Sequence, residues 1–120
     1  MLLLSACDGP PALTSAIQTN PSARTHIALG VWFAERKQFL CAIDLFEAAV
    51  SVDPSSWEAH YDLALALIGA GRDADAERHL RAALPSAPPS SSSQISFQLG
   101  QLLVKQRRYS AAIPYLKATT

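Results

Sequence analysis

The sequence predicts an all-helical fold made of repeated pairs of antiparallel helices. Three observations predict it: a pattern of apolar and small residues that recurs after 34 residues, 21 alanines in a chain of 120 residues, and no stretch with sustained period-two alternation. Apolar residues make up 49% of the chain. This content excludes a disordered chain, because burial of so much apolar surface can offset the entropy lost on ordering.

The repeat is visible when residues 23–56 are laid over residues 57–90. The matched pairs are His26 and His60, Leu29 and Leu63, Gly30 and Ala64, Phe33 and Leu67, Ala42 and Ala76, Phe46 and Leu80, Ala49 and Ala83, and Pro54 and Pro88. A third copy begins at Ser93 and places Leu99, Gly100, Leu103, Ala112 and Leu116 at the same positions. Two extra residues before this copy fall in the Pro- and Ser-rich run 85–93, which we interpret as a linker.

Each copy is predicted to contain two helices. They are expected near 23–35 and 39–52 in the first copy, on either side of Gly71 in the second, and near 93–106 and 110–119 in the third. Ser55 and Glu58 fit a capping box before the first helix of the second copy. A further helix is expected within 11–21. Small residues such as Gly30 and Ala42 allow the two helices of a pair to approach closely.

This pattern resembles the tetratricopeptide repeat (TPR) family over residues 23–120. The resemblance implies a right-handed superhelical solenoid with TPR 1 at 23–56, TPR 2 at 57–90 and TPR 3 at 93–120, incomplete at its C-terminal end. Residues 11–22 are then an N-terminal packing helix and residues 1–10 a signal remnant or a flexible terminus. Lys37 and Arg107 depart from the family pattern, which usually has glycine at that position.

The family resemblance also implies a concave groove lined by the first helix of each repeat. The groove residues expected here are Ile27, Val31, Tyr61, Leu65, Ile68, Phe97, Gln101 and Val104. An apolar surface of this kind suits an amphipathic helix or an apolar extended segment of a partner. The alternative is that further repeats or a flanking helix cover it. The family's clamp for C-terminal carboxylates is not expected, because Ile27 and Val31 stand where that clamp has Lys and Asn.

Charge and motif content narrow the function. Ten basic and ten acidic residues cancel, which argues against a nucleic-acid partner because such binders need a basic surface. No catalytic, cofactor or metal motif appears, so we expect neither an enzyme nor a bound cofactor. His26 and His60 occupy equivalent repeat positions and are interpreted as structural residues. Cys41 is interpreted as a small packing residue.

The N-terminal residues suggest a lipid anchor. Leu4-Ser5-Ala6-Cys7 resembles a bacterial lipobox, in which Cys7 would be lipidated, although no basic residue precedes the apolar stretch. The other interpretation is a flexible terminus with a chance match. Contact with a membrane is expected only through this anchor. The expected location is the bacterial cell envelope if Cys7 is lipidated, and the cytoplasm otherwise.

The function predicted from these features is that of a protein–protein interaction scaffold. The alternative is the N-terminal TPR region of a larger enzyme or regulator whose chemistry lies past Thr120. At the C-terminal end no polar capping helix follows the third repeat, so self-association through that helix is a further expectation.

Overall fold

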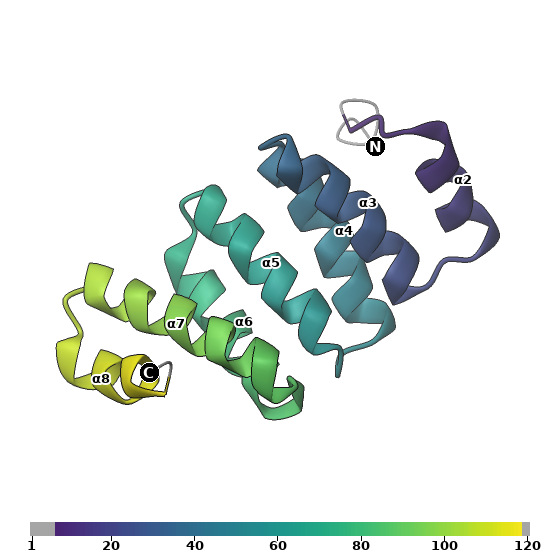
Figure 1. Cartoon of the computed structure of the whole chain (residues 1–120). Coiled ribbons are helices and arrows are strands. Elements are labelled where there is room, and N and C mark those ends of the chain that lie inside the picture. The colour runs from purple at the N-terminus through teal and green to yellow at the C-terminus, as the bar shows by residue number, and fades with distance from the viewer. Residues whose placement is uncertain (1–6, 119–120) are drawn as a thin grey trace.

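The computed structural model describes residues 7–118, and the regular elements in that range are all helical (Figure 1). In chain order they are α2 (Pro11–Thr19), α3 (Ala23–Glu35), α4 (Phe39–Val52), α5 (Trp57–Gly69), α6 (Asp73–Ala83), the short 3-10 helix η1 (Leu84–Ser86), α7 (Pro89–Lys105) and α8 (Tyr109–Lys117). The all-helical prediction is therefore confirmed for the described residues.

The helices form three antiparallel pairs that are stacked along one axis. The pairs are α3 with α4, α5 with α6, and α7 with α8, and each pair packs against the next through its second helix. Figure 1 shows α3, α5 and α7 following one another on one face of the stack, with α4 and α6 behind them, α8 beside α7 at the C-terminal end and α2 at the N-terminal end. The molecule is elongated as a result, with extents of 45 × 26 × 20 Å.

The core consists of the positions that recur in the sequence. Leu29, Leu63 and Leu99 are buried, and so are Phe33, Leu67 and Leu103 one helical turn later. Ala42, Ala76 and Ala112 are buried on the second helices. These three sets of equivalent residues belong to one hydrophobic cluster.

Close approach of the paired helices depends on a missing Cβ atom at two places. A Cβ atom added at Gly30 would overlap the aromatic ring of Phe46, and one at Gly100 would lie 2.6 Å from Cδ2 of Leu116. In the second repeat Ala64 stands at the position of Gly30 and Leu80 at the position of Phe46. The methyl group of Ala64 on the first helix is thus accompanied by a side chain on the second helix that is smaller than that of Phe46.

The turn inside each helix pair uses a left-handed backbone conformation. Gly71 has φ of +79°, and the equivalent residues Lys37 and Arg107 have φ of +60° and +62°. Glycine adopts this region at no steric cost, whereas a residue with a Cβ atom does not. The two departures from the family pattern therefore keep the family's turn geometry.

Two predicted helix starts differ in the structure. The side chain that caps α5 is Ser56, which accepts the Ala59 N–H, because Ser55 instead donates its N–H and its hydroxyl to Asp53. Helix α7 begins at Pro89, four residues before the predicted start. Proline suits the first helical position because its φ is fixed near the helical value. The serine run is the first turn of α7, not a linker.

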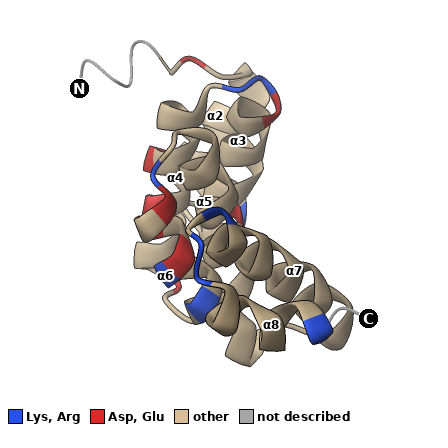
Figure 2. Cartoon of the chain, turned by 90° about the vertical axis from the view of Figure 1, so that its left-hand side faces the viewer, with Lys and Arg blue, Asp and Glu red and all other residues tan. Residues whose placement is uncertain are grey.

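Ionic contacts join the second repeat to the third. Glu77 of α6 accepts hydrogen bonds from Arg81 at 3.0 Å and from Arg108 at 2.6 Å, and Lys105 lies 2.9 Å from Asp73. Figure 2 shows charged residues gathered along α4 and α6, whereas α7 is nearly free of them. The equivalent place on α4 holds Ile43, so the two repeat–repeat interfaces differ in chemistry.

Candidate functional site

The predicted groove residues lie on the three first helices of the repeats. Helix α3 contributes Ile27 and Val31, α5 contributes Tyr61, Leu65 and Ile68, and α7 contributes Phe97, Gln101 and Val104. Spacings of three or four residues place each set on one side of its helix. Helices α3, α5 and α7 follow one another on one face of the stack (Figure 1), so the three sets come from neighbouring helices.

Exposure of these side chains increases toward the C-terminal end. The five on α3 and α5 are half-buried, and Ile27, Val31, Tyr61 and Ile68 pack against the core. On α7, Phe97 is 44% exposed and Val104 is 40% exposed. An exposed phenylalanine next to half-buried apolar residues gives the surface a hydrophobic contact area that solvent reaches.

Two of the predicted residues meet at one hollow. Tyr61 and Phe97 line a hollow of about 480 Å³ together with Ser93, Gln94 and Gln98. The walls are therefore aromatic, while the hydroxyl and amide groups supply hydrogen-bond donors and acceptors without formal charge. This combination suits a peptide, whose backbone needs hydrogen bonds and whose apolar side chains need an aromatic contact.

The carboxyl groups of Glu58 and Asp62 both lie on α5, close in sequence to Tyr61. Burial, and secondarily the charge of Glu58, raises the pKa of Asp62 to about 6. Burial also raises the pKa of Tyr61, with a smaller effect from Asp62. No cation among residues 7–118 forms an ion pair with Asp62. Around neutral pH the negative charge of Asp62 on α5 is therefore held at an energetic cost.

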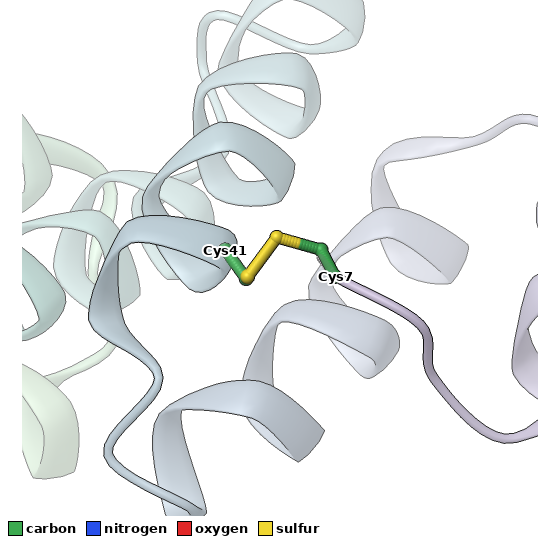
Figure 3. Close-up of a disulfide and its surroundings, with 2 residues drawn as sticks. All are labelled: Cys7 and Cys41. Carbon is green, nitrogen blue, oxygen red and sulfur yellow. A yellow bond between two sulfur atoms is a disulfide. The ribbon is translucent and has the colours of Figure 1, made fainter. Parts of the chain in front are cut away.

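Cys7 is bonded to Cys41 in a disulfide, a contact that the sequence analysis did not anticipate (Figure 3). The bond ties the segment before α2 to the first turn of α4, and the two Cα atoms are 5.5 Å apart. A sulfur in a disulfide does not carry a thioether-linked lipid, so the lipobox interpretation and this bond exclude each other in one molecule. The other lipobox residues, Leu4, Ser5 and Ala6, lie outside the described residues. Cys41 is half-buried and packs against the core, as predicted, and it is in addition a disulfide partner.

The last repeat presents an apolar face on its second helix. Ile113 of α8 is 51% exposed, whereas Ile43, its equivalent in the first repeat, is 3% exposed beneath α5. Tyr109 is exposed on the same helix. Self-association through this face stays a prediction, which light scattering on the chain and on Ile113→Glu would test.

Within residues 7–118 there is no group of three or more His, Cys, Asp or Glu side chains placed to bind a metal ion. Over the same residues, no helix combines the length and apolar character that crossing a membrane requires. His60 does lie close to a second histidine, His79, which the sequence analysis missed because the two occupy different repeat positions.

Comparisons with known proteins agree with this architecture. A family model described as tetratricopeptide repeat matches residues 33–94. The crystal structure of MamA superposes with a TM-score of 0.81 at 21% identity, covering 90% of this chain and 63% of MamA. YrrB, described as a TPR protein with an unusual peptide-binding site, gives 0.82 at 23% identity, covering 90% of this chain and 55% of YrrB.

A third solved structure, MamA from Desulfovibrio magneticus RS-1 (residue 41 to the end), gives a TM-score of 0.79 at 19% identity, covering 89% of this chain and 60% of that one. The chain thus spans between 55% and 63% of the lengths of these three proteins. Identities this low show a shared fold. A search of curated proteins found no significant match.

Proposed function

The chain belongs to the tetratricopeptide repeat family, whose members are protein–protein interaction scaffolds, and from this premise we propose that it holds an apolar segment of a partner protein in its groove. The segment is a helix or an extended peptide with apolar side chains at regular spacing. The observation that carries the proposal is the hollow between Tyr61 and Phe97.

The chemistry of that hollow favours a peptide over a charged ligand. Its lining residues Tyr61, Ser93, Gln94, Phe97 and Gln98 carry no formal charge. Aromatic anchors in partly dry hollows commonly dominate the energy of an interface, with about 2 kcal/mol or more lost on truncation. A partner side chain placed between Tyr61 and Phe97 therefore accounts for most of the expected affinity.

A selection from a random peptide library tests the proposal. Peptides that bind the wild-type chain should share apolar residues at helical or alternating spacing. Tyr61→Ala and Phe97→Ala should each weaken a selected peptide at least about tenfold, measured by fluorescence anisotropy. Raising the salt concentration should change the affinity little, since the hollow lacks charge.

A matched control comes from the opposite helices. Leu40 of α4 is 62% exposed and lies outside the groove residues, so Leu40→Ala removes a comparable exposed apolar side chain and should leave peptide binding unchanged. Circular dichroism and melting temperature establish that each variant is folded. Selected peptides that bind Tyr61→Ala and Phe97→Ala as tightly as the wild type would contradict the proposal.

We also propose that the chain works in an oxidising compartment such as the bacterial envelope. The disulfide between Cys7 and Cys41 supports this location, because disulfides persist in such compartments and are rare in the cytosol. Intact-mass measurement of the protein purified from bacterial envelopes tests it. A disulfide lowers the mass by the two thiol hydrogens, whereas lipidation of Cys7 adds an acyl mass. A protein with two free thiols would contradict both the disulfide-bonded and the lipidated form.

A further inference from the structure

A second hollow lies at the N-terminal end of the solenoid and shares no residue with the groove. This N-terminal cleft has a volume of about 640 Å³ and lies between the segment before α2, α2 itself, and the pair α3 and α4. Its lining residues are Cys7, Asp8, Gly9, Pro11, Thr14, Ile17, Gln18, His26, Leu29, Cys41, Asp44, Leu45 and Ala48. The volume falls in the range of small-molecule sites, about 300–1,000 Å³.

The cleft exists because α2 packs incompletely against the first repeat. The main contact of α2 is with α3, and it has no comparable contact with α4. Between α4 and α5, by contrast, the packing is extensive. Ile17 of α2, Leu29 of α3 and Leu45 of α4 therefore face a common space that no side chain of the described residues fills.

The N-terminal cleft has two carboxyl groups among its lining residues, beside the uncharged Thr14 and Gln18. Asp8 and Asp44 both line it, and neither forms an ion pair with a cation of residues 7–118. No Lys or Arg is among the lining residues. Nδ1 of His26 lies 2.8 Å from the carbonyl oxygen of Ser22, so this ring nitrogen is already engaged with the backbone. An apolar body with one positive charge is the ligand class that this lining complements.

We propose that the N-terminal cleft binds an amphiphilic cation, a small molecule with an apolar body and a single ammonium group. Its body contacts Ile17, Leu29 and Leu45, and its ammonium group lies against Asp44 and Asp8. The disulfide is part of the site, because Cys7, Asp8 and Gly9 are among the lining residues. The Cys7–Cys41 bond links this segment covalently to α4 (Figure 3).

Three compounds with the same apolar body and different charge test the proposal. Phenylbutylammonium, phenylbutanol and phenylbutyrate are titrated into the isotope-labelled oxidised chain, and amide chemical shifts are followed by NMR. The ammonium compound should bind most tightly and shift the amides of Ile17, Leu29 and Leu45. Asp44→Asn should weaken its binding about fivefold and leave phenylbutanol binding unchanged.

Matched variants separate the cleft from the rest of the surface. Ala48→Phe, which places a ring in the cleft, should abolish binding of all three compounds. Glu35→Gln removes an exposed carboxylate at the end of α3, outside the cleft, and should change nothing. Because Cys7→Ser/Cys41→Ser could also alter folding, the wild type is measured before reduction, after reduction and after reoxidation, with helicity followed by circular dichroism.

Reduction should weaken phenylbutylammonium binding at least about fivefold at unchanged helicity, and reoxidation should restore it. Equal binding of the three compounds would overturn the cationic ligand class. Shifts confined to other residues would overturn the site. Unchanged affinity after reduction would overturn the role given to the disulfide.

Discussion

The Nδ1 atoms of His60 and His79 lie 3.0 Å apart, and the two rings are stacked with centroids 5.3 Å from each other. Nε2 of His60 lies 2.8 Å from the carbonyl oxygen of Pro54, so this nitrogen is the one that carries hydrogen. In the neutral pair, His60 then accepts at Nδ1 the hydrogen that His79 donates from its own Nδ1. This hydrogen bond joins α5 to α6, and it requires that Nδ1 of His60 carries no hydrogen.

His79 stabilises the fold in its neutral form, so its contribution to stability should fall when the pH is lowered from 7 toward 5. Burial, then His60, then Arg78 hold the pKa of His79 below 6.5, while Asp75 opposes them. The unfolded chain takes up the proton at higher pH than the folded one, so this stabilisation is complete above pH 6.5 and is lost as pH falls through the folded pKa. Urea unfolding over this range should show that the free energy of unfolding of the wild type falls relative to that of His79→Gln as the pH is lowered.

Asp62→Asn should raise the free energy of unfolding at pH 7 by about 1–3 kcal/mol. The pKa of Asp62 is raised to about 6 by burial and Glu58, so its charge opposes folding above that pH. The penalty disappears as pH falls from 6 toward 4, because the folded state then holds the proton. Asp75→Asn is the control, since Arg72 and Arg78 lower the pKa of Asp75. An Asp62→Asn variant less stable than wild type at pH 7 would refute this account.

Gly30→Ala should destabilise the chain by about 1–3 kcal/mol, because its new methyl group overlaps the Phe46 ring. Phe46→Leu should also destabilise, through loss of buried apolar volume. The double variant recreates the Ala64 and Leu80 pair of the second repeat, so its cost should fall below the sum of the single costs by about 1 kcal/mol. Additive costs in a double-mutant cycle by chemical unfolding would show that the two residues do not interact.

Replacing the turn residues should have opposite effects in different repeats. Gly71→Ala introduces a Cβ atom at φ of +79° and should destabilise by about 1 kcal/mol. Lys37→Gly and Arg107→Gly relieve a left-handed conformation of similar φ and should raise the melting temperature. A Gly71→Ala variant that melts above the wild type, or glycine variants of Lys37 and Arg107 that melt below it, would contradict this explanation.

Most of the fold could be predicted because the repeat places the same residue types at the same depth three times. Leu29, Leu63 and Leu99 occupy the same buried position in the three repeats. A wrong assignment of buried residues in one repeat is therefore revealed by comparison with the other two. The start of α7 was missed because consecutive serines and prolines are typical of linkers, although Pro89 at the first helical position also favours a helix.

Contacts between different repeat positions were less predictable. The Cys7–Cys41 bond requires the N-terminal segment to cross α3 and reach α4, and no local pattern specifies that path. The hydrogen bond from His79 to His60 and the ion pair between Glu77 and Arg108 likewise depend on how one helix is placed on the next. The groove residues were derived from family positions, and their role in binding stays a prediction.

The disulfide also determines how the oxidised chain would respond to a pulling force. Cys7 and Cys41 are 34 residues apart, which is the length of one repeat. Tension applied between residue 7 and the C-terminal end passes through the sulfur–sulfur bond directly into α4, and α2 and α3 carry none of it. At roughly 3.3–3.6 Å per residue, the oxidised chain would stretch about 110 Å less than the reduced one. Oxidation would make residues 7–41 inextensible, while the rest of α4 and the helices α5 to α8 could still unravel.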